Sequence, residues 1–166
     1  LEDGVTALST QFPSIAAGVN MNNTTNYKFR GLATSAEYAD LAERYEADAE
    51  YEAGTVVRLG GTHEITQTMQ AHDSDVFGIV STSPGFEMNA GAGTDATHPF
   101  VALAGRVPCK VIGKVVKGQR IVSSATPGHA MAISTPSSEC YAVIGRALES
   151  KDTDEAGTIE VVVGAK

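Results

Sequence analysis

The stretch FVALAGRVPCKVI, residues 100–112, holds two runs of apolar and β-branched residues on either side of Gly105-Arg106. Such runs, bounded by a glycine, are typical of short buried strands joined by a turn. Pro108 has no backbone N–H to give to a sheet, so it predicts a sheet edge or a bulge at this point. The stretch therefore predicts two β-strands, the second with a sheet edge or a bulge at Pro108.

Similar runs recur along the rest of the chain, and they are separated by turn-forming residues. The chain has 17 Gly and 6 Pro, which suits a protein with many turns. We expect about seven to nine short strands, a spacing typical of a closed barrel or a sandwich. The fold class is therefore mainly β, a β-barrel or sandwich. The further strand ranges are 55–59, 63–69, 75–81, 115–116, 121–122, 141–145 and 158–163. The side chains expected in the core are Val76, Ile79, Val101, Leu103, Val111, Ile121, Val122, Val143, Ile144, Val161 and Val163.

Three regions differ in composition. Residues 1–33 have too few large apolar groups to form a core of their own, so we interpret them as an extended arm that is ordered only by packing on something else. Residues 34–52 form a junction, and residues 53–166 form the β domain. The alternative for the arm is a flexible segment. The residues that would anchor it are Phe12, Ile15, Met21, Tyr27 and Phe29.

The junction fits two structures. Thr34 and Glu37 have the spacing of a capping box, and Tyr38, Leu41 and Tyr45 fall on one face of a helix. That spacing predicts one short helix. The same residues could instead run extended into the next strand.

Charge and composition exclude several classes of partner. A formal net charge of −8 disfavours nucleic acid and anionic membrane surfaces, because both attract basic proteins. No apolar run approaches the roughly 20 residues of a membrane-spanning helix. Residues 1–4 hold neither an initiator Met nor a signal peptide, so we expect a fragment or a processed product of something longer.

Catalytic and metal-binding motifs are not found in the sequence. The four histidines are scattered, and neither a nucleophile elbow nor a phosphate-binding loop is present. The acidic run 37–52 is interpreted as a solvated face, with a weak cation site as the alternative. Cys109 and Cys140 are interpreted as two buried thiols, with a single bridge between strands as the alternative. We therefore expect no catalytic residue, no metal site and no cofactor.

One loop stands out as a candidate binding surface. Residues 83–98 are rich in glycine and polar residues, and they carry large side chains that a simple turn does not need. Loops on a rigid β scaffold are the usual place for binding. The alternative is that Phe86 and Met88 pack into the core or against a neighbouring subunit. The candidate binding residues are Phe86, Met88, Asn89 and His98.

Several phrases, read together, resemble a known family. They are VNMNN (19–23), GLAT (31–34), YADLAERY (38–45), VFGIVSTSP (76–84), VALAGRVPCKV (101–111) and GTIEVVVG (157–164). The chain from about residue 33 to residue 165 resembles the C-terminal β domain of structural fibre proteins of tailed phages, notably cyanophages. The two phrases before residue 35 resemble one that recurs in phage tail and capsid fibres.

This resemblance implies a structural protein of a tailed-phage virion. The expected protein is a homotrimer in a tail or head fibre, whose terminal domain caps the fibre and keeps three chains in register. In such a trimer Met21, Tyr27 and Phe29 point inward. The implied partners are sister chains, other virion proteins and a host cell-surface receptor, with assembly in the host cytoplasm. The alternative is a decoration or adaptor protein on the capsid or tail.

A second, more distant resemblance bears on enzymatic activity. The chain is similar to the autoproteolytic domain of Bacillus-phage neck appendages, which serves as an intramolecular chaperone. That likeness implies self-cleavage between Ala36 and Glu37, with Glu37 and Asp40 as the catalytic acids. The two acids are exchanged relative to that family. Misplacing a carboxylate by about one bond can cost ~100-fold in rate. We therefore predict a protein that does not cleave itself and is not an enzyme.

Overall fold

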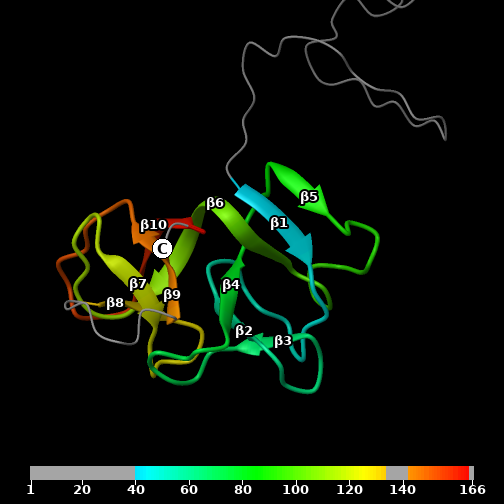
Figure 1. Ribbon diagram of the computed structural model, residues 1–166, viewed down its shortest axis with the longest axis horizontal. Helices are drawn as coiled ribbons and strands as arrows, with labels where there is room; N and C mark the ends of the chain where they lie inside the picture. The colour runs from blue at the N-terminus through cyan, green and yellow to red at the C-terminus, as the bar shows by residue number, and fades with distance from the viewer. Residues whose placement is uncertain (1–39, 134–141, 165–166) are drawn as a thin grey trace, which may run out of the picture. The chain divides into compact units, whose positions relative to one another are not determined.

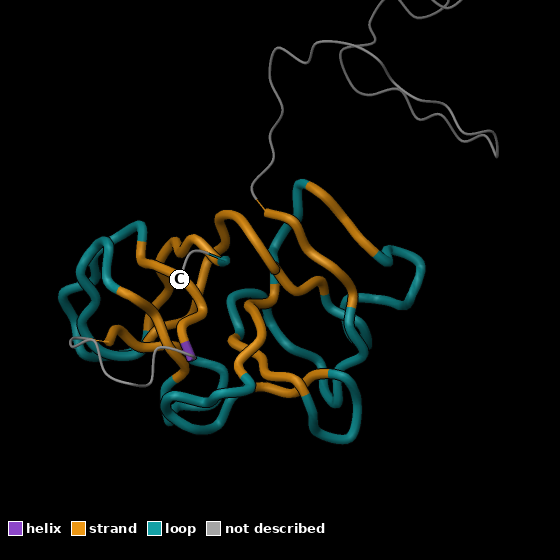
Figure 2. Tube along the Cα trace, in the orientation of Figure 1, coloured by secondary structure: helices purple, strands orange, loops and turns teal. Residues whose placement is uncertain are grey.

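The computed structural model describes residues 40–133 and 142–164, and this part of the chain is mainly β, as the sequence predicts. Figure 2 shows strands and loops with almost no helix. The strands of the described residues are β1 (Asp40–Arg44), β2 (Val56–Leu59), β3 (Ile65–Gln67), β4 (Val76–Val80), β5 (Phe86–Met88), β6 (Phe100–Val111), β7 (Arg120–Ser123), β8 (Ala130–Ile133), β9 (Val143–Ala147) and β10 (Gly157–Val163).

Five strands close into a barrel. Its order is β6–β10–β9–β7–β8, and β8 returns to β6 through the parallel pair Val111–Ala130. Apolar side chains from all five strands fill its interior, including the fully buried Val111, Ile121 and Val161. Closure removes free strand edges from this part of the fold.

The remaining strands extend from the N-terminal half of β6. On one path β4, β2 and β3 follow β6, and on the other β1 pairs with β6 and carries β5 (Figure 1). A second core cluster of Ala47, Val57, Ile65, Val80 and Val101 lies here. The Tyr45 ring meets the Phe77 ring edge-on at 4.9 Å between centroids.

The stretch around Gly105 differs from the two strands predicted. β6 runs unbroken for 12 residues, and Gly105 has a φ of +108° that a larger residue rarely adopts. The N-terminal half of β6 pairs with β1 and β4, whereas the half from Gly105 onward pairs with β10. The glycine therefore lets one strand change partners without ending.

The edge predicted at Pro108 is confirmed. The Lys110 amide donates to the Gly54 carbonyl oxygen (2.9 Å), away from β10. Because strand amides alternate in direction, Pro108 also turns its nitrogen towards the Gly54 loop. Pro108 therefore lacks its N–H on the side where β6 meets a loop, and the hydrogen bonds between β6 and β10 are unaffected.

Most of the expected core side chains are buried. The exceptions are Val76 and Leu103, which are half-buried and pack against the two core clusters.

The part of the junction that is described is extended. Asp40–Arg44 forms β1, so the helix predicted over these residues is wrong and the extended alternative holds. Burial alternates along β1, with Asp40 and Ala42 buried, as expected for a strand between β5 and β6. The arm, with Phe12, Ile15, Met21, Tyr27 and Phe29, lies outside the described residues, as do Glu37 and Cys140. The domain boundaries stay a prediction.

The ranges 40–133 and 142–164 contain no helix long and apolar enough to cross a membrane.

Candidate functional site

The candidate binding surface begins at β5, an exposed edge strand. β5 pairs with β1 in parallel, and Phe86 lies opposite Leu41. The Gly85 amide donates to the Asp40 carbonyl oxygen (3.0 Å), so by alternation the amides of Phe86 and Met88 face away from β1. Within the part of the chain that is described, no strand pairs with that outer side. We call this outer side the β5 edge.

The predicted binding residues divide into two groups. Phe86 is 59% exposed on the β5 edge, so the alternative that it packs into the core of its own chain is wrong; Met88 beside it is partly buried. Asn89 and His98 lie instead at the two ends of the following loop. Asn89 has a φ of +54°, a left-handed conformation that Asn tolerates better than most residues.

One residue that the sequence did not single out, Arg44 of β1, joins Asn89 to His98. Asn89 Nδ2 donates to the Arg44 carbonyl oxygen (3.3 Å), and Arg44 Nη1 donates to the His98 carbonyl oxygen (2.5 Å). Arg44 Nη2 also pairs with Asp95 Oδ1 at 2.8 Å, and the guanidinium carbon lies 3.9 Å from the centre of the Phe100 ring. The loop from Asn89 to His98 is therefore fastened to β1 at several points.

Nothing in the sequence around Arg44 marks this role. It is one arginine in an acidic stretch, and its partners lie some fifty positions further along the chain. The pairing of β1 with β5 and with β6 brings them together.

Asp40, one of the two candidate acids for self-cleavage, is buried at the start of β1. It is 5% exposed, and burial raises the pKa of its carboxyl above the ordinary value of 3.8. The neighbouring Ser81 hydroxyl lowers this pKa again in part, but the two groups are not aligned as a full hydrogen bond: Asp40 Oδ2 has no partner of good geometry among the described residues. Burial thus shifts the titration of the Asp40 carboxyl towards higher pH.

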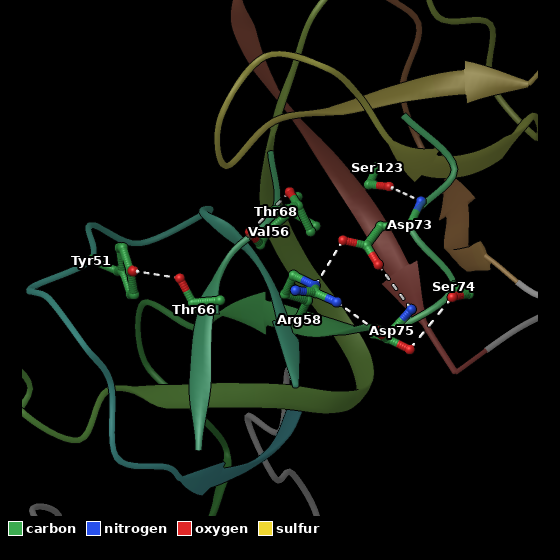
Figure 3. Close-up of polar contacts among 9 residues, drawn as sticks. All are labelled: Tyr51, Val56, Arg58, Thr66, Thr68, Asp73, Ser74, Asp75 and Ser123. Atoms are coloured by element: carbon green, nitrogen blue, oxygen red, sulfur yellow. Dashed lines mark hydrogen bonds and ion pairs between the residues drawn. The ribbon is translucent and has the colours of Figure 1, made fainter. Parts of the chain in front are cut away.

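A second polar cluster surrounds Arg58 of β2 (Figure 3). Arg58 Nε lies 2.8 Å from Asp73 Oδ2, and Nη2 lies 2.5 Å from Asp75 Oδ2. The buried Asp73 accepts the Asp75 amide proton (3.0 Å), and its own amide donates to Ser123 Oγ (2.8 Å). These contacts hold the turn before β4 against β2 and β7, so we interpret the cluster as structural.

The remaining candidate chemistry is sparse. Over residues 40–133 and 142–164, no three His, Cys, Asp or Glu side chains gather as they would around a metal ion. Cys109 is a free, fully buried thiol, and burial raises its pKa to about 12. A thiol with so high a pKa is a poor nucleophile at neutral pH, and it packs as a small apolar side chain.

Comparison with known proteins finds similar chains among solved structures. No protein-family model matches the chain, and no curated protein does. Among solved structures, the chain is similar to the C-terminal fragment of gene product 12 of bacteriophage phi29, at 15% sequence identity and a TM-score of 0.52. The match covers 75% of this chain and 99% of that fragment. The base of the phi29 head fibre gp8.5 matches at 13% identity and a TM-score of 0.43, over 75% of this chain and 93% of that one.

The first of these likenesses establishes a common fold. Nearly the whole phi29 fragment superimposes on this chain, so the fold expected from the sequence resemblance to phage fibre domains is the fold observed.

Proposed function

We propose that this chain is a structural domain of a tailed-phage virion, which ends a fibre or appendage as a homotrimer and contacts the host surface. The observation that carries the proposal is the fold shared with the phi29 gene product 12 fragment over nearly the full length of that fragment. The fibre-like phrases at residues 19–34 support it independently.

Two features of the β domain favour a role in assembly and attachment. The closed barrel leaves few strand edges, which suits a rigid end-piece. Outside the barrel, the β5 edge combines unpaired backbone groups with the exposed Phe86. An open edge with an aromatic side chain is suited to contact with another chain or a receptor.

The oligomeric state tests the assembly part of the proposal. Light scattering of the intact chain is expected to give three times 17.2 kDa. The double substitution Tyr27→Ser/Phe29→Ser removes two predicted inward anchors and should shift the mass towards the monomer, whereas Lys28→Ser should not. A stable 17.2 kDa monomer of the unmodified chain would contradict the trimer and favour a decoration or adaptor protein.

Self-cleavage is the second candidate function, and the buried Asp40 is the observation that favours it. A carboxyl group whose pKa is raised by burial is a candidate proton donor or acceptor. The exchange of Glu37 and Asp40 relative to the cleaving family still favours a chain that stays whole. Intact-mass spectrometry after days at neutral pH should therefore find only the full-length chain, and a product that starts at Glu37 would contradict this.

A further inference from the structure

A small pocket of about 240 Å³ lies among three loops that precede or follow strands β2, β4 and β6. Its lining includes the large apolar side chains of Tyr51, Pro84, Pro99 and Phe100. None of the predicted binding residues lines it. We call it the Tyr51 pocket.

Backbone hydrogen bonds fix the three loops that form the Tyr51 pocket. The Gly54 amide donates to the Val80 carbonyl oxygen (2.8 Å), and the Ser81 amide donates to the Phe100 carbonyl oxygen (2.8 Å). The third loop is held by the ion pair between Asp95 and Arg44. The pocket is therefore formed before any ligand arrives, which reduces the entropy cost of binding.

The Tyr51 pocket is also lined by polar side chains. Ser81, Thr82 and Asp95 line it, and each carries oxygen atoms that can form hydrogen bonds. Ser81 Oγ is buried and faces the Asp40 carboxyl group, so Thr82 and Asp95 are the polar side chains left for a ligand. The Asp95 side chain is 85% exposed, and only its Oδ1 is engaged by Arg44.

Charge and size limit the ligand that fits. The lining residues include no Lys, Arg or His, so an anion would meet no cation there. The one carboxylate, Asp95, is already paired with Arg44, so a cation would gain little. The volume of about 240 Å³ lies below the roughly 300–1,000 Å³ of pockets for drug-sized ligands, so one ring is the appropriate size.

We propose that the Tyr51 pocket binds one ring of a neutral saccharide. The apolar C–H face of the ring packs on Tyr51 and the two prolines, and the ring hydroxyl groups bond to Thr82 and Asp95. This inference rests on the proposed attachment to a host surface and names the chemistry of what is recognised there: a neutral glycan.

A titration of the full chain followed by NMR tests the inference directly. The probes are methyl glycosides of neutral hexoses and of N-acetylhexosamines, with glucuronic acid as an anionic comparison. We expect Kd values of about 1–10 mM, the range of weak single-ring contacts, with shifts concentrated at the amides of Ser81, Thr82 and Asp95. Shifts confined to other surfaces, or none with any neutral sugar, would overturn the inference.

A pair of variants adds a control. Ala53 is an exposed residue in the pocket wall, so Ala53→Phe should fill the pocket and weaken binding at least tenfold. Met69 is 66% exposed on a separate surface beside Arg58, and Met69→Phe should leave the affinity unchanged. Equal affinity in both variants would place the sugar elsewhere. The trimer mass is measured without any sugar, so the two experiments are independent. A titration without binding leaves the proposed assembly role standing. A monomeric mass contradicts the trimer but does not affect the measurement of sugar binding.

Discussion

The guanidinium group of Arg44 lies over the ring of Phe100, with 3.9 Å between its central carbon and the ring centre. The same group pairs with Asp95 and donates to the His98 carbonyl oxygen. One side chain of β1 thus fastens both the start of β6 and the loop that precedes it. This loop forms part of the Tyr51 pocket and connects to β5, so Arg44 determines how rigid the candidate binding surface is.

Replacing Arg44 should loosen this surface. Arg44→Ala removes a largely buried cation–π contact and two charge-assisted hydrogen bonds, so we expect a loss of about 1–3 kcal/mol in unfolding free energy. Hydrogen exchange should accelerate at residues 89–98. Arg44→Lys should recover only part of the loss, because an ammonium group lacks the planar fork of donors. Urea unfolding and exchange mass spectrometry measure both effects.

The exposed Arg106 provides the matched control for this prediction. Arg106→Ala removes the same charge from the neighbouring strand and should change the unfolding free energy by no more than about 0.5 kcal/mol. Unchanged exchange at residues 89–98 in Arg44→Ala would mean that the loop is held by its own backbone contacts.

A close approach of two strands in the barrel predicts a severe effect at Gly145 of β9. A Cβ atom at this position would lie 2.0 Å from the Val162 carbonyl oxygen of β10. Gly145→Ala should therefore push β9 away from β10 and cost at least about 2 kcal/mol. Gly91→Ala is the control, since its Cβ would meet nothing within 4 Å. Thermal unfolding of the two variants checks the contrast, and similar melting temperatures would mean that the barrel adjusts at β9.

The sequence predicts local structure well and the pairing of distant strands poorly. The β-branched runs at residues 55–59 and 158–163 each become a strand, β2 and β10, because their preference for extended backbone agrees with their burial. The closure of the barrel could not be predicted from local preference. It depends on one pair between β6 and β8, Val111 and Ala130, which lie far apart in the sequence.

The junction shows why periodicity alone is ambiguous. Residues 38–45 have apolar side chains at helical spacing, yet Asp40–Arg44 is a strand. Hydrogen bonds to β5 and β6 on both sides outweigh the local preference. The Tyr51 pocket and the Arg44 contacts could not be predicted from the sequence either, because both join residues that lie far apart in the chain.

The exposure of Phe86 leads to a prediction that separates folding from function. Phe86→Ser should change the unfolding free energy by no more than about 0.5 kcal/mol, because the ring is mostly in water. If the β5 edge contacts a sister chain or a receptor, the same substitution should lower the trimer fraction or phage adsorption. Glu87→Gln, on the same strand, is the control for a change in charge alone. Normal trimers and normal adsorption with Phe86→Ser would remove the β5 edge from both roles.

The buried Asp40 predicts an unusual dependence of stability on pH. Burial raises the pKa of Asp40 above 3.8 in the folded chain, so the folded state holds this proton more tightly than the unfolded state does. As the pH rises from about 4 through the raised value, the folded state must give up the proton and the contribution of Asp40 to the unfolding free energy falls. Above that window the charged carboxylate is a constant cost to stability. Asp40→Asn should therefore make the chain more stable at pH 7 and should flatten its pH dependence between pH 4 and the folded-state value.

Urea unfolding of Asp40→Asn and of the unmodified chain, in steps from pH 4 to pH 7, measures this difference directly. Asp152→Asn changes an exposed acid and serves as the control, because the other carboxyl groups of the chain titrate over the same range. A variant less stable than the unmodified chain at pH 7 would mean that the Asp40 carboxylate has a favourable partner in the assembled protein.

Mass spectrometry of the same samples tests self-cleavage as well. The decisive result is an unmodified chain that loses its first 36 residues and an Asp40→Asn variant that stays whole, with both forming the same oligomer. That result would give Asp40 a catalytic role. Its burial would then serve to keep a proton available rather than to support β1.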